Sequence, residues 1–439
     1  MVYNNTGKMR SGRMTQISMW EATENKRETH EKLEGDQHCD VVIIGGGYSG
    51  LSTSYHLQEK NYKTIVLEKD RVGDGASGRN GGEVLTGYIG SMEYWAKKKG
   101  LGAAKTMWQL SLDSIDLIEN IIKKHDISCD FIRNGDFYAA YKPSHLEGMK
   151  KDQEYMAREL GYEEIKIVEK NNLQDELNTS FYHGGRVDGK SAHFHPLNYA
   201  LGLAEVATKL GAKIYEKSEA LNIVKNAKGK MVVTTKEGRV FADHVVIVTN
   251  AYSGDLNKTI KKSVVPIESI MISTEILPES LMNDVIRNNR AVSDSKELLY
   301  YFRRTADNRM AFGGSGRSSS KRDQQNLYDN LRAGMVNVFP QLKDAKIEYR
   351  WSGKVGFTKD MLPYIGRLED GSHYAFGYAG HGAAMSSLMG KLIAENIINE
   401  SDAHNPLRVE KLKPIPFHGQ HSTGVGIIKV YKQLQDRFF

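Results

Sequence analysis

The segment Asp40-Val-Val-Ile-Ile-Gly45-Gly-Gly47-Tyr-Ser-Gly50 decides the fold of this chain. Its apolar residues suffice for one buried strand, and the G-x-G-x-x-G pattern places a tight turn between that strand and a helix. In this geometry the backbone N–H groups that begin the helix point at a pyrophosphate. Gly45 permits the turn, Gly47 lets the pyrophosphate approach the backbone, and Gly50 lets the helix pack closely on the strand. The segment therefore predicts a dinucleotide site.

An acidic residue follows at the end of the next apolar run. Glu68 comes directly after Thr64-Ile-Val-Leu67, which is where a carboxylate accepts hydrogen bonds from a ribose diol in such a βαβ unit. A carboxylate there repels a 2′-phosphate, so NADP is disfavoured. The alternative is a glycine-rich structural turn, since G-x-G-x-x-G alone is a weak signal. Strand, glycines, helix, strand and acid in this order favour the dinucleotide.

Composition excludes several classes of protein. The 439 residues are enough for two or three domains, and no apolar run approaches the twenty residues of a membrane span. Lys and Arg number 60 against 54 Asp and Glu, and their spread along mixed-charge segments indicates solvated faces rather than a nucleic-acid surface. Cys39 and Cys129 lack disulfide or metal-ligand spacing. We expect no metal site and, because no signal peptide is evident, a cytoplasmic location.

The spacing of apolar residues divides the chain into alternating helices and strands. Nucleotide-type segments occur early, in the middle and late, so we expect a cofactor domain built from residues 38–125, 190–255 and 346–405. A substrate domain comprises 126–189 and 256–345, with a polar lead-in at 1–37 and a tail with a helix at 406–439. The expected fold class is α/β (α+β overall): a Rossmann-like domain of discontinuous segments plus an antiparallel-sheet domain with helices. Helices are predicted at about 103–124, 146–160, 197–210, 324–338 and 383–396, and strands at 213–216, 221–225, 231–235, 239–241, 244–249, 264–277, 298–303, 310–313, 347–351 and 374–377.

A second glycine-rich segment follows Glu68. It reads Arg71-Val-Gly-Asp-Gly75-Ala-Ser-Gly-Arg79-Asn-Gly-Gly82, and it resembles the second fingerprint of the FAD-dependent D-amino-acid-oxidase and glycine-oxidase superfamily. The similarity is strongest to the branch of γ-glutamylputrescine oxidoreductase-like amine oxidases, which carries Ala-Ser-Gly-Arg-Asn-Gly-Gly. Further similar stretches are Ser191–Leu197, Val248–Tyr252, Trp351–Gly366 and Gly377–Gly382, so the resemblance covers about residues 19–439.

The resemblance implies that the cofactor is FAD. A backbone that runs beside a flat isoalloxazine ring needs small residues, as at 75–82, although an ordinary loop is the alternative. Residues 380–382 open the last long helix, whose N-terminal N–H groups stabilise negative charge on reduced flavin. The expected cofactor contacts are Gly45, Gly47, Tyr48, Ser49, Gly50, Glu68, Lys69, Ser77, Arg79, Asn80, Gly81, Gly82, the backbone of Val224 for adenine, Gly380, His381 and Gly382.

The FAD is expected to bind non-covalently. Val355 stands where sarcosine-oxidase-like members carry a flavin-linked cysteine, and residues 71–90 contain no histidine of the kind that dimethylglycine-dehydrogenase-like members use. For His381 the alternative role is to cap the turn before the last helix.

The family resemblance implies oxidation of a C–N bond in an amine or amino acid. Hydride passes from the α-carbon to flavin N5, the imine is hydrolysed, and oxygen reoxidises the flavin. Such chemistry depends on positioning, so no catalytic acid or base is assigned. A γ-glutamylputrescine-like or other secondary or primary amine is the expected substrate, with no nucleic-acid partner. A dehydrogenase that passes electrons to a quinone or carrier, and a non-catalytic flavin-binding protein, remain the alternatives.

Five side chains are candidates for substrate contact, and each also has a structural interpretation. Arg303 offers a bidentate fork for a carboxylate, or it is a strand arginine. The other candidates are Tyr301, His195 (with its neighbour His193), Trp351 and Tyr88, which line the site or belong to the core and to helix caps. Glu83 departs from the pattern of the γ-glutamylputrescine oxidoreductase branch, which commonly has Gln at this position. A charged side chain near the pocket entrance favours a substrate with a cationic tail or changes the substrate.

Overall fold

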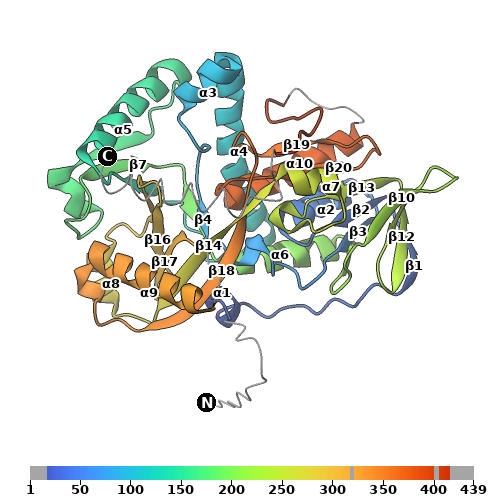
Figure 1. The fold of residues 1–439 in the computed structure, drawn as a ribbon, viewed down its shortest axis with the longest axis horizontal. Helices are drawn as coiled ribbons and strands as arrows, with labels where there is room; N and C mark the ends of the chain where they lie inside the picture. The colour runs from blue at the N-terminus through green and yellow to red at the C-terminus, as the bar shows by residue number, and fades with distance from the viewer. Residues whose placement is uncertain (1–16, 317–320, 400–404, 416–439) are drawn as a thin grey trace, which may run out of the picture.

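A parallel β-sheet carries the predicted nucleotide-binding turn. The computed structural model describes residues 17–316, 321–399 and 405–415, and Figure 1 shows their arrangement. The predicted lead-in before residue 17 and the predicted helix after residue 415 lie outside this range. The sheet has the order β19-β20-β13-β2-β3-β9, and only β19 runs antiparallel to its neighbour. Its strands are β2 (Val41–Ile44), β3 (Thr64–Leu67), β9 (Lys213–Tyr215), β13 (His244–Ile247), β19 (Tyr364–Arg367) and β20 (His373–Phe376).

Both faces of this sheet are covered, which explains its apolar strands. All residues of β2 and β3 are buried, as expected for parallel strands between two layers. One face packs on helices α2 (Tyr48–Gln58), α4 (Leu101–His125), α6 (Pro196–Lys209) and α10 (Gly382–Ile398). The other packs on a smaller sheet of order β1-β12-β11-β10, with β1 (Gly35–His38), β10 (Asn222–Lys225), β11 (Met231–Thr234) and β12 (Gly238–Ala242). The predicted antiparallel excursion that returns to a core strand is therefore confirmed.

The second part of the molecule is built on an eight-stranded, mainly antiparallel sheet. Its order is β18-β14-β17-β16-β15-β5-β7-β6, and it lies to the left of the parallel sheet in Figure 1. Its strands are β5 (Asp136–Ala139), β6 (Ile165–Glu169), β7 (Gly184–Asp188), β14 (Val265–Thr274), β15 (Ala291–Asp294), β16 (Tyr300–Arg304), β17 (Met310–Ser315) and β18 (Ile347–Phe357). Among the described elements the rest are α1 (Met19–Ala22), α3 (Met92–Lys99), α5 (Pro143–Tyr155) with a π-helical turn at Met156–Leu160, α7 (Lys258–Ser263), α8 (Glu279–Val285), α9 (Lys321–Val338), the strand pair β4 (Glu83–Val84) and β8 (Ala192–His193), and 3₁₀ turns at Ala76–Gly78, Lys170–Asp175, Asn250–Tyr252 and Pro340–Leu342. The expected fold class is confirmed.

Strand β18 differs from the sequence prediction. The apolar pattern predicts a strand at 347–351, but β18 continues to Phe357 and pairs along its length with β14. Two glycines interrupt the apolar pattern of this strand because they let neighbouring residues approach its backbone closely. A Cβ on Gly356 would lie 2.3 Å from Oδ1 of Asn250, and one on Gly353 would lie 3.2 Å from Cβ of Arg79. By hydrogen bonding, residues 347–357 thus belong to the eight-stranded sheet, although the sequence places them in the cofactor domain.

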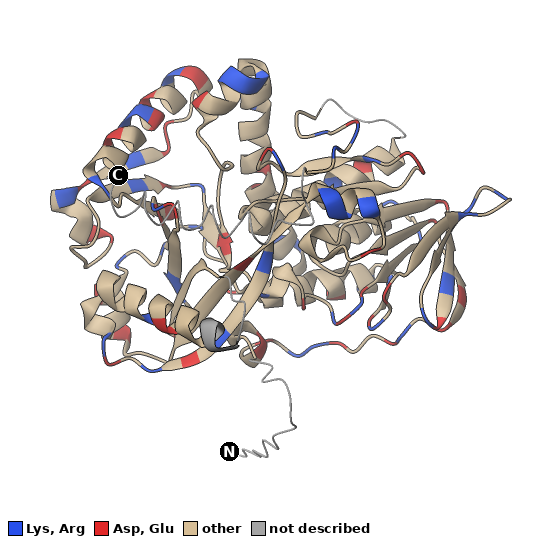
Figure 2. Cartoon of the chain, in the orientation of Figure 1, with Lys and Arg blue, Asp and Glu red and all other residues tan. Residues whose placement is uncertain are grey.

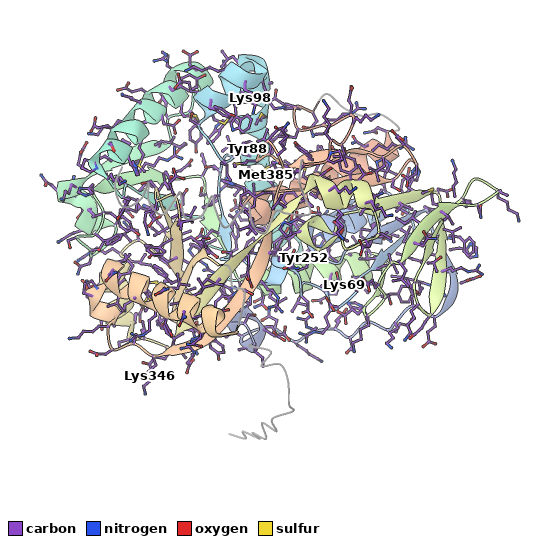
Figure 3. The ribbon with its side chains drawn as sticks, viewed as in Figure 1. Lys69, Tyr88, Lys98, Tyr252, Lys346 and Met385 are labelled. Carbon is purple, nitrogen blue, oxygen red and sulfur yellow. The ribbon has the colours of Figure 1, made fainter. Side chains whose placement is uncertain are left out.

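The distribution of charge agrees with a solvated surface. Basic and acidic residues alternate over the outer helices and loops in Figure 2. Within the described residues, no helix is long and apolar enough to cross a membrane. Figure 3 places Tyr88 and Met385 near the middle of the molecule and Lys346 at its edge.

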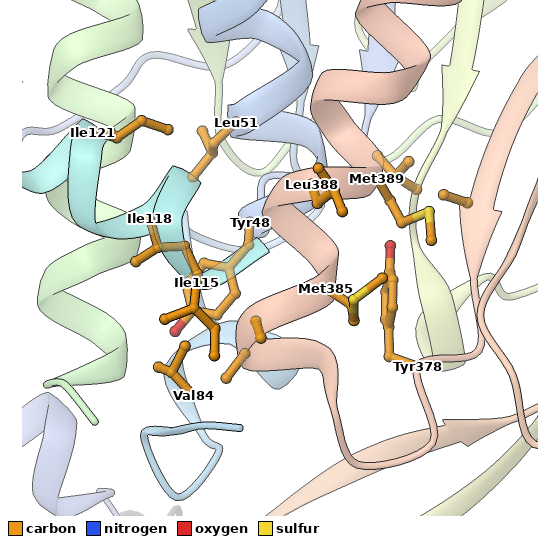
Figure 4. Packing of buried hydrophobic residues seen from close by; sticks show 14 of the residues in the cluster. Tyr48, Leu51, Val84, Ile115, Ile118, Ile121, Tyr378, Met385, Leu388 and Met389 are labelled. Atoms are coloured by element: carbon orange, nitrogen blue, oxygen red, sulfur yellow. The ribbon is translucent and has the colours of Figure 1, made fainter. Parts of the chain in front are cut away.

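Helices α2 and α10 cross closely because small residues face each other. The Ser52 hydroxyl donates to the Ser387 carbonyl at 2.6 Å. A Cβ on Gly390 would lie 2.4 Å from the carbonyl oxygen of Ser49. Larger side chains on either side of the crossing fill the surrounding core, as Leu51, Leu388 and Met389 show in Figure 4. This crossing joins the first nucleotide-binding helix to the last helix of the sheet.

Replacing Gly390 with alanine should lower the free energy of unfolding by about 1–3 kcal/mol, because the added methyl group overpacks the crossing. Gly148, inside α5, is the matched control, since a Cβ there meets nothing within 4 Å. The Gly148→Ala change should leave stability equal or raise it by about 0.5–1 kcal/mol. Urea unfolding followed by circular dichroism measures both, and a Gly390→Ala protein as stable as the wild type would refute the tight crossing.

Candidate active site

A single large cavity connects the parallel sheet with the eight-stranded sheet. Its volume is about 1590 Å³, which exceeds the roughly 300–1,000 Å³ of a typical small-molecule pocket. Ile44, Leu67 and Val248, at the carboxyl ends of three parallel strands, line one end. Tyr138 and Tyr301, from the eight-stranded sheet, line another part. The carboxyl edge of a parallel sheet is the expected place for a nucleotide, and the remaining space accommodates a second small molecule.

The glycine-rich turn has the geometry that its sequence predicts. Gly45 has φ +117° and a Cβ there would lie 3.1 Å from the Val248 carbonyl oxygen. A Cβ on Gly47 would lie 2.8 Å from Oγ of Ser77. Gly47 is the N-cap of α2, and it has no side chain to cap the helix. Gly50 lies outside the cavity lining, and a Cβ on it would meet the Gly45 carbonyl oxygen at 2.0 Å, so it allows the helix to pack on the turn.

Glu68 is held rigidly at the cavity. Its Oε2 accepts from the Gly46 N–H at 2.7 Å and its Oε1 from the Asp70 N–H at 2.9 Å. Burial raises the pKa of Glu68, and these two backbone donors oppose the rise. The fixed carboxylate retains lone pairs for a diol. Beside it, Lys69 Nζ lies 5.7 Å from the centre of the Tyr252 ring, and Figure 3 shows the two residues close together.

The loop at 75–82 is fixed by side chains from distant parts of the chain. The Tyr48 N–H donates to Oγ of Ser77 at 3.0 Å, and the Tyr48 hydroxyl donates to the Ser77 carbonyl at 2.6 Å. Asn80 Nδ2 donates to that same carbonyl at 2.9 Å. The indoles of Trp20 and Trp351 donate to the carbonyls of Asn80 and Arg79 at 2.8 and 3.0 Å. Ser77, Arg79, Asn80 and Gly81 line the cavity; Gly82, at φ +76°, packs instead against the Phe194 carbonyl.

The start of helix α10 forms another part of the cavity wall. Gly380, His381 and Gly382 all line it, and no side chain caps this helix end. Burial lowers the pKa of His381 to about 4, so its imidazole is neutral, and its buried Nδ1 lacks a hydrogen-bond partner among the described residues. Two helix N-termini whose own N-cap residues supply no side-chain cap, those of α2 and α10, thus face one cavity. This arrangement fits a large anionic cofactor that carries a pyrophosphate.

Comparison with known proteins decides the family. Residues 40–396 match the model of the DAO family, described as FAD dependent oxidoreductase. The chain belongs to this family. It is 37% identical over 370 residues to a probable oxidoreductase OrdL of Haemophilus influenzae, covering 83% of this chain and 84% of the relative. It is 33% identical over 424 residues to the gamma-glutamylputrescine oxidoreductase of Escherichia coli, covering 96% and 98%. The glycine oxidase structure from Geobacillus kaustophilus shares the fold, with a TM-score of 0.70 at 21% identity over 84% of this chain and 96% of that one.

FAD is therefore the cofactor, and the cavity of this DAO-family enzyme can be assigned in part. The cavity lining includes Gly45, Gly47, Tyr48, Ser49, Glu68 and Lys69 from the first fingerprint. Val224 does not line it: this residue lies on β10 and is 47% exposed. Glu219, Ala220 and Leu221, just before that strand, reach the cavity instead. The sequence could not place the expected adenine contact, since a contact made by the backbone leaves no side-chain signal.

Arg303 does not face the cavity, which corrects its prediction as a carboxylate fork. The side chain is 2% exposed. Nε donates to the Gly81 carbonyl at 2.8 Å, a terminal nitrogen donates to the Phe194 carbonyl at 2.6 Å, and the other lies 3.0 Å from Nδ1 of His193. Its guanidinium carbon lies 5.0 Å from the centre of the Trp20 ring. The guanidinium therefore joins strand β16 to the loop at 75–82, which we call the flavin loop.

His195 and Trp351 also lie outside the cavity lining, so the structural interpretation holds for both. His195 is the N-cap of α6: its Nδ1 accepts from the Asn198 N–H at 3.1 Å, and Nε2 lies 3.0 Å from the Thr23 hydroxyl. Trp351 is 1% exposed and supports the flavin loop from behind.

The other two candidate residues, Tyr301 and Tyr88, do line the cavity. The Tyr301 ring lies against Gly81, where an added Cβ would be 3.1 Å from it, and its hydroxyl shares a 2.8 Å hydrogen bond with Ser269. The Tyr88 hydroxyl donates to the Met107 carbonyl at 2.9 Å. Both hydroxyls are engaged within the protein, so both rings serve as walls.

Sequence reasoning missed a group of polar residues on the eight-stranded sheet. Asp136 lines the cavity and pairs across the strands with Asp188. Asp188 accepts from the hydroxyls of Tyr162 and Thr86 at 2.5 and 2.8 Å. Burial, and then Asp188, raise the pKa of Asp136 well above its ordinary value. Asp152 and Arg186, which form a 2.9 Å ion pair, line the same region. In the sequence, the only sign of this group is a pair of short alternating strands, β5 and β7. Asp136 and Asp188 come together only when these strands pair, which the sequence does not show.

Replacing Arg303 with methionine should lower stability by about 2 kcal/mol or more, since two buried carbonyls lose donors at about 1–3 kcal/mol each. Arg239→Met is the control, because Arg239 is exposed, pairs with the exposed Asp36 and lies over the Phe241 ring; the change should cost under about 1 kcal/mol. Thermal unfolding of the FAD-loaded proteins measures both. If Arg303→Met left the stability unchanged but abolished a preference for carboxylate-bearing substrates, the predicted role of Arg303 as a carboxylate fork would be supported instead.

Proposed function

We propose that this chain oxidises a C–N bond of an amine by transferring hydride from the α-carbon to FAD, after which the imine is hydrolysed. The observation that carries this proposal is the continuous cavity, which joins the dinucleotide turn to a polar face of the second sheet. Family membership and the 33% identity to gamma-glutamylputrescine oxidoreductase support it. Bound FAD supplies the two-electron acceptor.

The chain's own residues position and select the substrate rather than donate protons. The uncapped start of α10 offers N–H groups and about half an elementary positive charge to the developing anion. Tyr301 and Gly81 form one wall of the adjoining space, and Tyr88 forms another. These groups hold an amine in place and keep water out, which is what hydride transfer requires.

An elongated amine suits this cavity better than an α-amino acid. The arginine predicted to bind a carboxylate is occupied by backbone carbonyls. Residues of α5 such as Met149 and Asp152 also line the cavity. A γ-glutamylputrescine-like or secondary amine is the proposed substrate class. Molecular oxygen is the proposed electron acceptor, in a cytoplasmic enzyme.

The FAD should be released by acid precipitation, because Val355 lines the cavity where a linking cysteine would stand. Both cysteines, Cys39 and Cys129, are buried and lie outside the lining. After trichloroacetic acid treatment of the purified holoenzyme, the yellow flavin absorbance should remain in the supernatant. Yellow protein in the pellet would show covalent attachment.

Anaerobic addition of a suitable amine should bleach the FAD-loaded enzyme, and readmitted oxygen should restore the colour with formation of peroxide. The panel comprises γ-glutamyl amines, polyamines, N-methyl amino acids and amino acids. Bleaching that is reversed by a quinone or dye without peroxide identifies a dehydrogenase instead. Enzyme that holds FAD but is bleached by no member of the panel contradicts the proposed function.

A further inference from the structure

Glu83 lies where the flavin loop meets the substrate space. It is the first residue of β4, directly after the loop that ends at Gly82, and it lines the cavity. Its Cδ lies 3.7 Å from the position of a Cβ on Gly81, the position that the Tyr301 ring approaches to 3.1 Å. The carboxyl group and the Tyr301 ring thus flank the same glycine. A ligand that reaches this part of the cavity meets the carboxyl group.

One oxygen of the Glu83 carboxyl group lacks a hydrogen-bond partner among the described residues. Its Oε1 is buried and accepts no hydrogen bond from any described residue. The nearby guanidinium of Arg303 influences it electrostatically, but its N–H groups are directed at the Gly81 and Phe194 carbonyls and at His193. A buried carboxylate without donors is costly, because it loses hydration and gains nothing in return.

Several carboxyl groups gather around this region. Asp136 lines the same cavity and acts on Glu83 as a second negative group. Among the basic residues nearby, Arg186 forms an ion pair with Asp152 and Arg290 one with Glu176. Arg303 opposes the charge of Glu83, whereas Arg186 and Arg290 oppose that of Asp136, and Asp188 adds a further carboxyl group beside Asp136. Because Arg186 and Arg290 already form ion pairs, one positive charge brought by a ligand would stabilise the ionised forms of Glu83 and Asp136.

We propose that Glu83, supported by Asp136, binds a cationic nitrogen of the substrate and makes the enzyme selective for ammonium-bearing ligands over neutral ones of the same shape. The inference rests on the proposed amine oxidation for calling that ligand a substrate. An ammonium group carries three N–H donors, so it can donate to the Glu83 carboxyl group and share its charge with both carboxyl groups. Burial raises the pKa of Glu83 well above its ordinary value, and a bound cation opposes that rise.

The test compares two ligands that differ in charge and cannot react. In 2-phenyl-2-propylamine the carbon beside nitrogen carries no hydrogen, so the flavin cannot oxidise it; 2-phenyl-2-propanol is its neutral counterpart. Titration of the FAD-loaded wild type, followed by the flavin absorbance spectrum, should show the ammonium binding about 10- to 100-fold more tightly than the alcohol. In Glu83→Gln this ratio should fall about tenfold or more, while the affinity for the alcohol stays within about threefold.

Two further variants separate a charge effect from misfolding. Glu83→Asp keeps the negative charge and should retain part of the preference for the ammonium. Asp116→Asn removes a half-exposed carboxylate of α4 that pairs with Arg133, and it should leave the ratio unchanged. An unchanged ratio in Glu83→Gln overturns the inference, as does a wild type that binds both ligands equally. Because neither ligand is oxidised, these results are independent of the bleaching screen: ammonium selectivity without bleaching rejects the proposed function and keeps the cation site.

Discussion

The buried guanidinium of Arg303 is the interaction on which the site depends. It binds the carbonyls of Gly81, in the flavin loop, and Phe194, just after β8, while its own backbone belongs to β16. Three segments that are far apart in the sequence are thereby fixed around one planar group. An arginine suits this task because its donors lie in a rigid plane and its charge persists when buried. The loop is small and glycine-rich, so it has no side-chain core of its own to hold its shape.

The indoles of Trp20 and Trp351 and the amide of Asn80 complete this support. Each donates to a loop carbonyl, so the backbone beside the cofactor is defined by hydrogen bonds from behind. The cavity face of the loop is left to small residues. Rigidity and close approach are thus obtained together, and the cavity wall keeps a fixed shape.

Local patterns predicted well what local geometry determines. The turn at Gly45 to Gly50 and the position of Glu68 follow from spacing within one βαβ unit, and the structure confirms their geometry. Arg303 shows where this reasoning ends. Alternation along β16 places Tyr301 and Arg303 on one face of the strand. It cannot show that residues 81 and 82 cover Arg303 while Tyr301 stays open to the cavity. Glu83 was noticed only as a departure from its relatives, because its missing partner is a property of the folded environment.

The close crossing of α2 and α10 bears on how the protein is made. The dinucleotide turn is synthesised well before β20 and α10, which complete the sheet and another part of the cavity wall. A nascent chain that lacks α10 has no partner for the small-residue face of α2. A chain without residues 373–398 therefore lacks part of the cavity wall, so the complete cavity forms only after these residues have been synthesised.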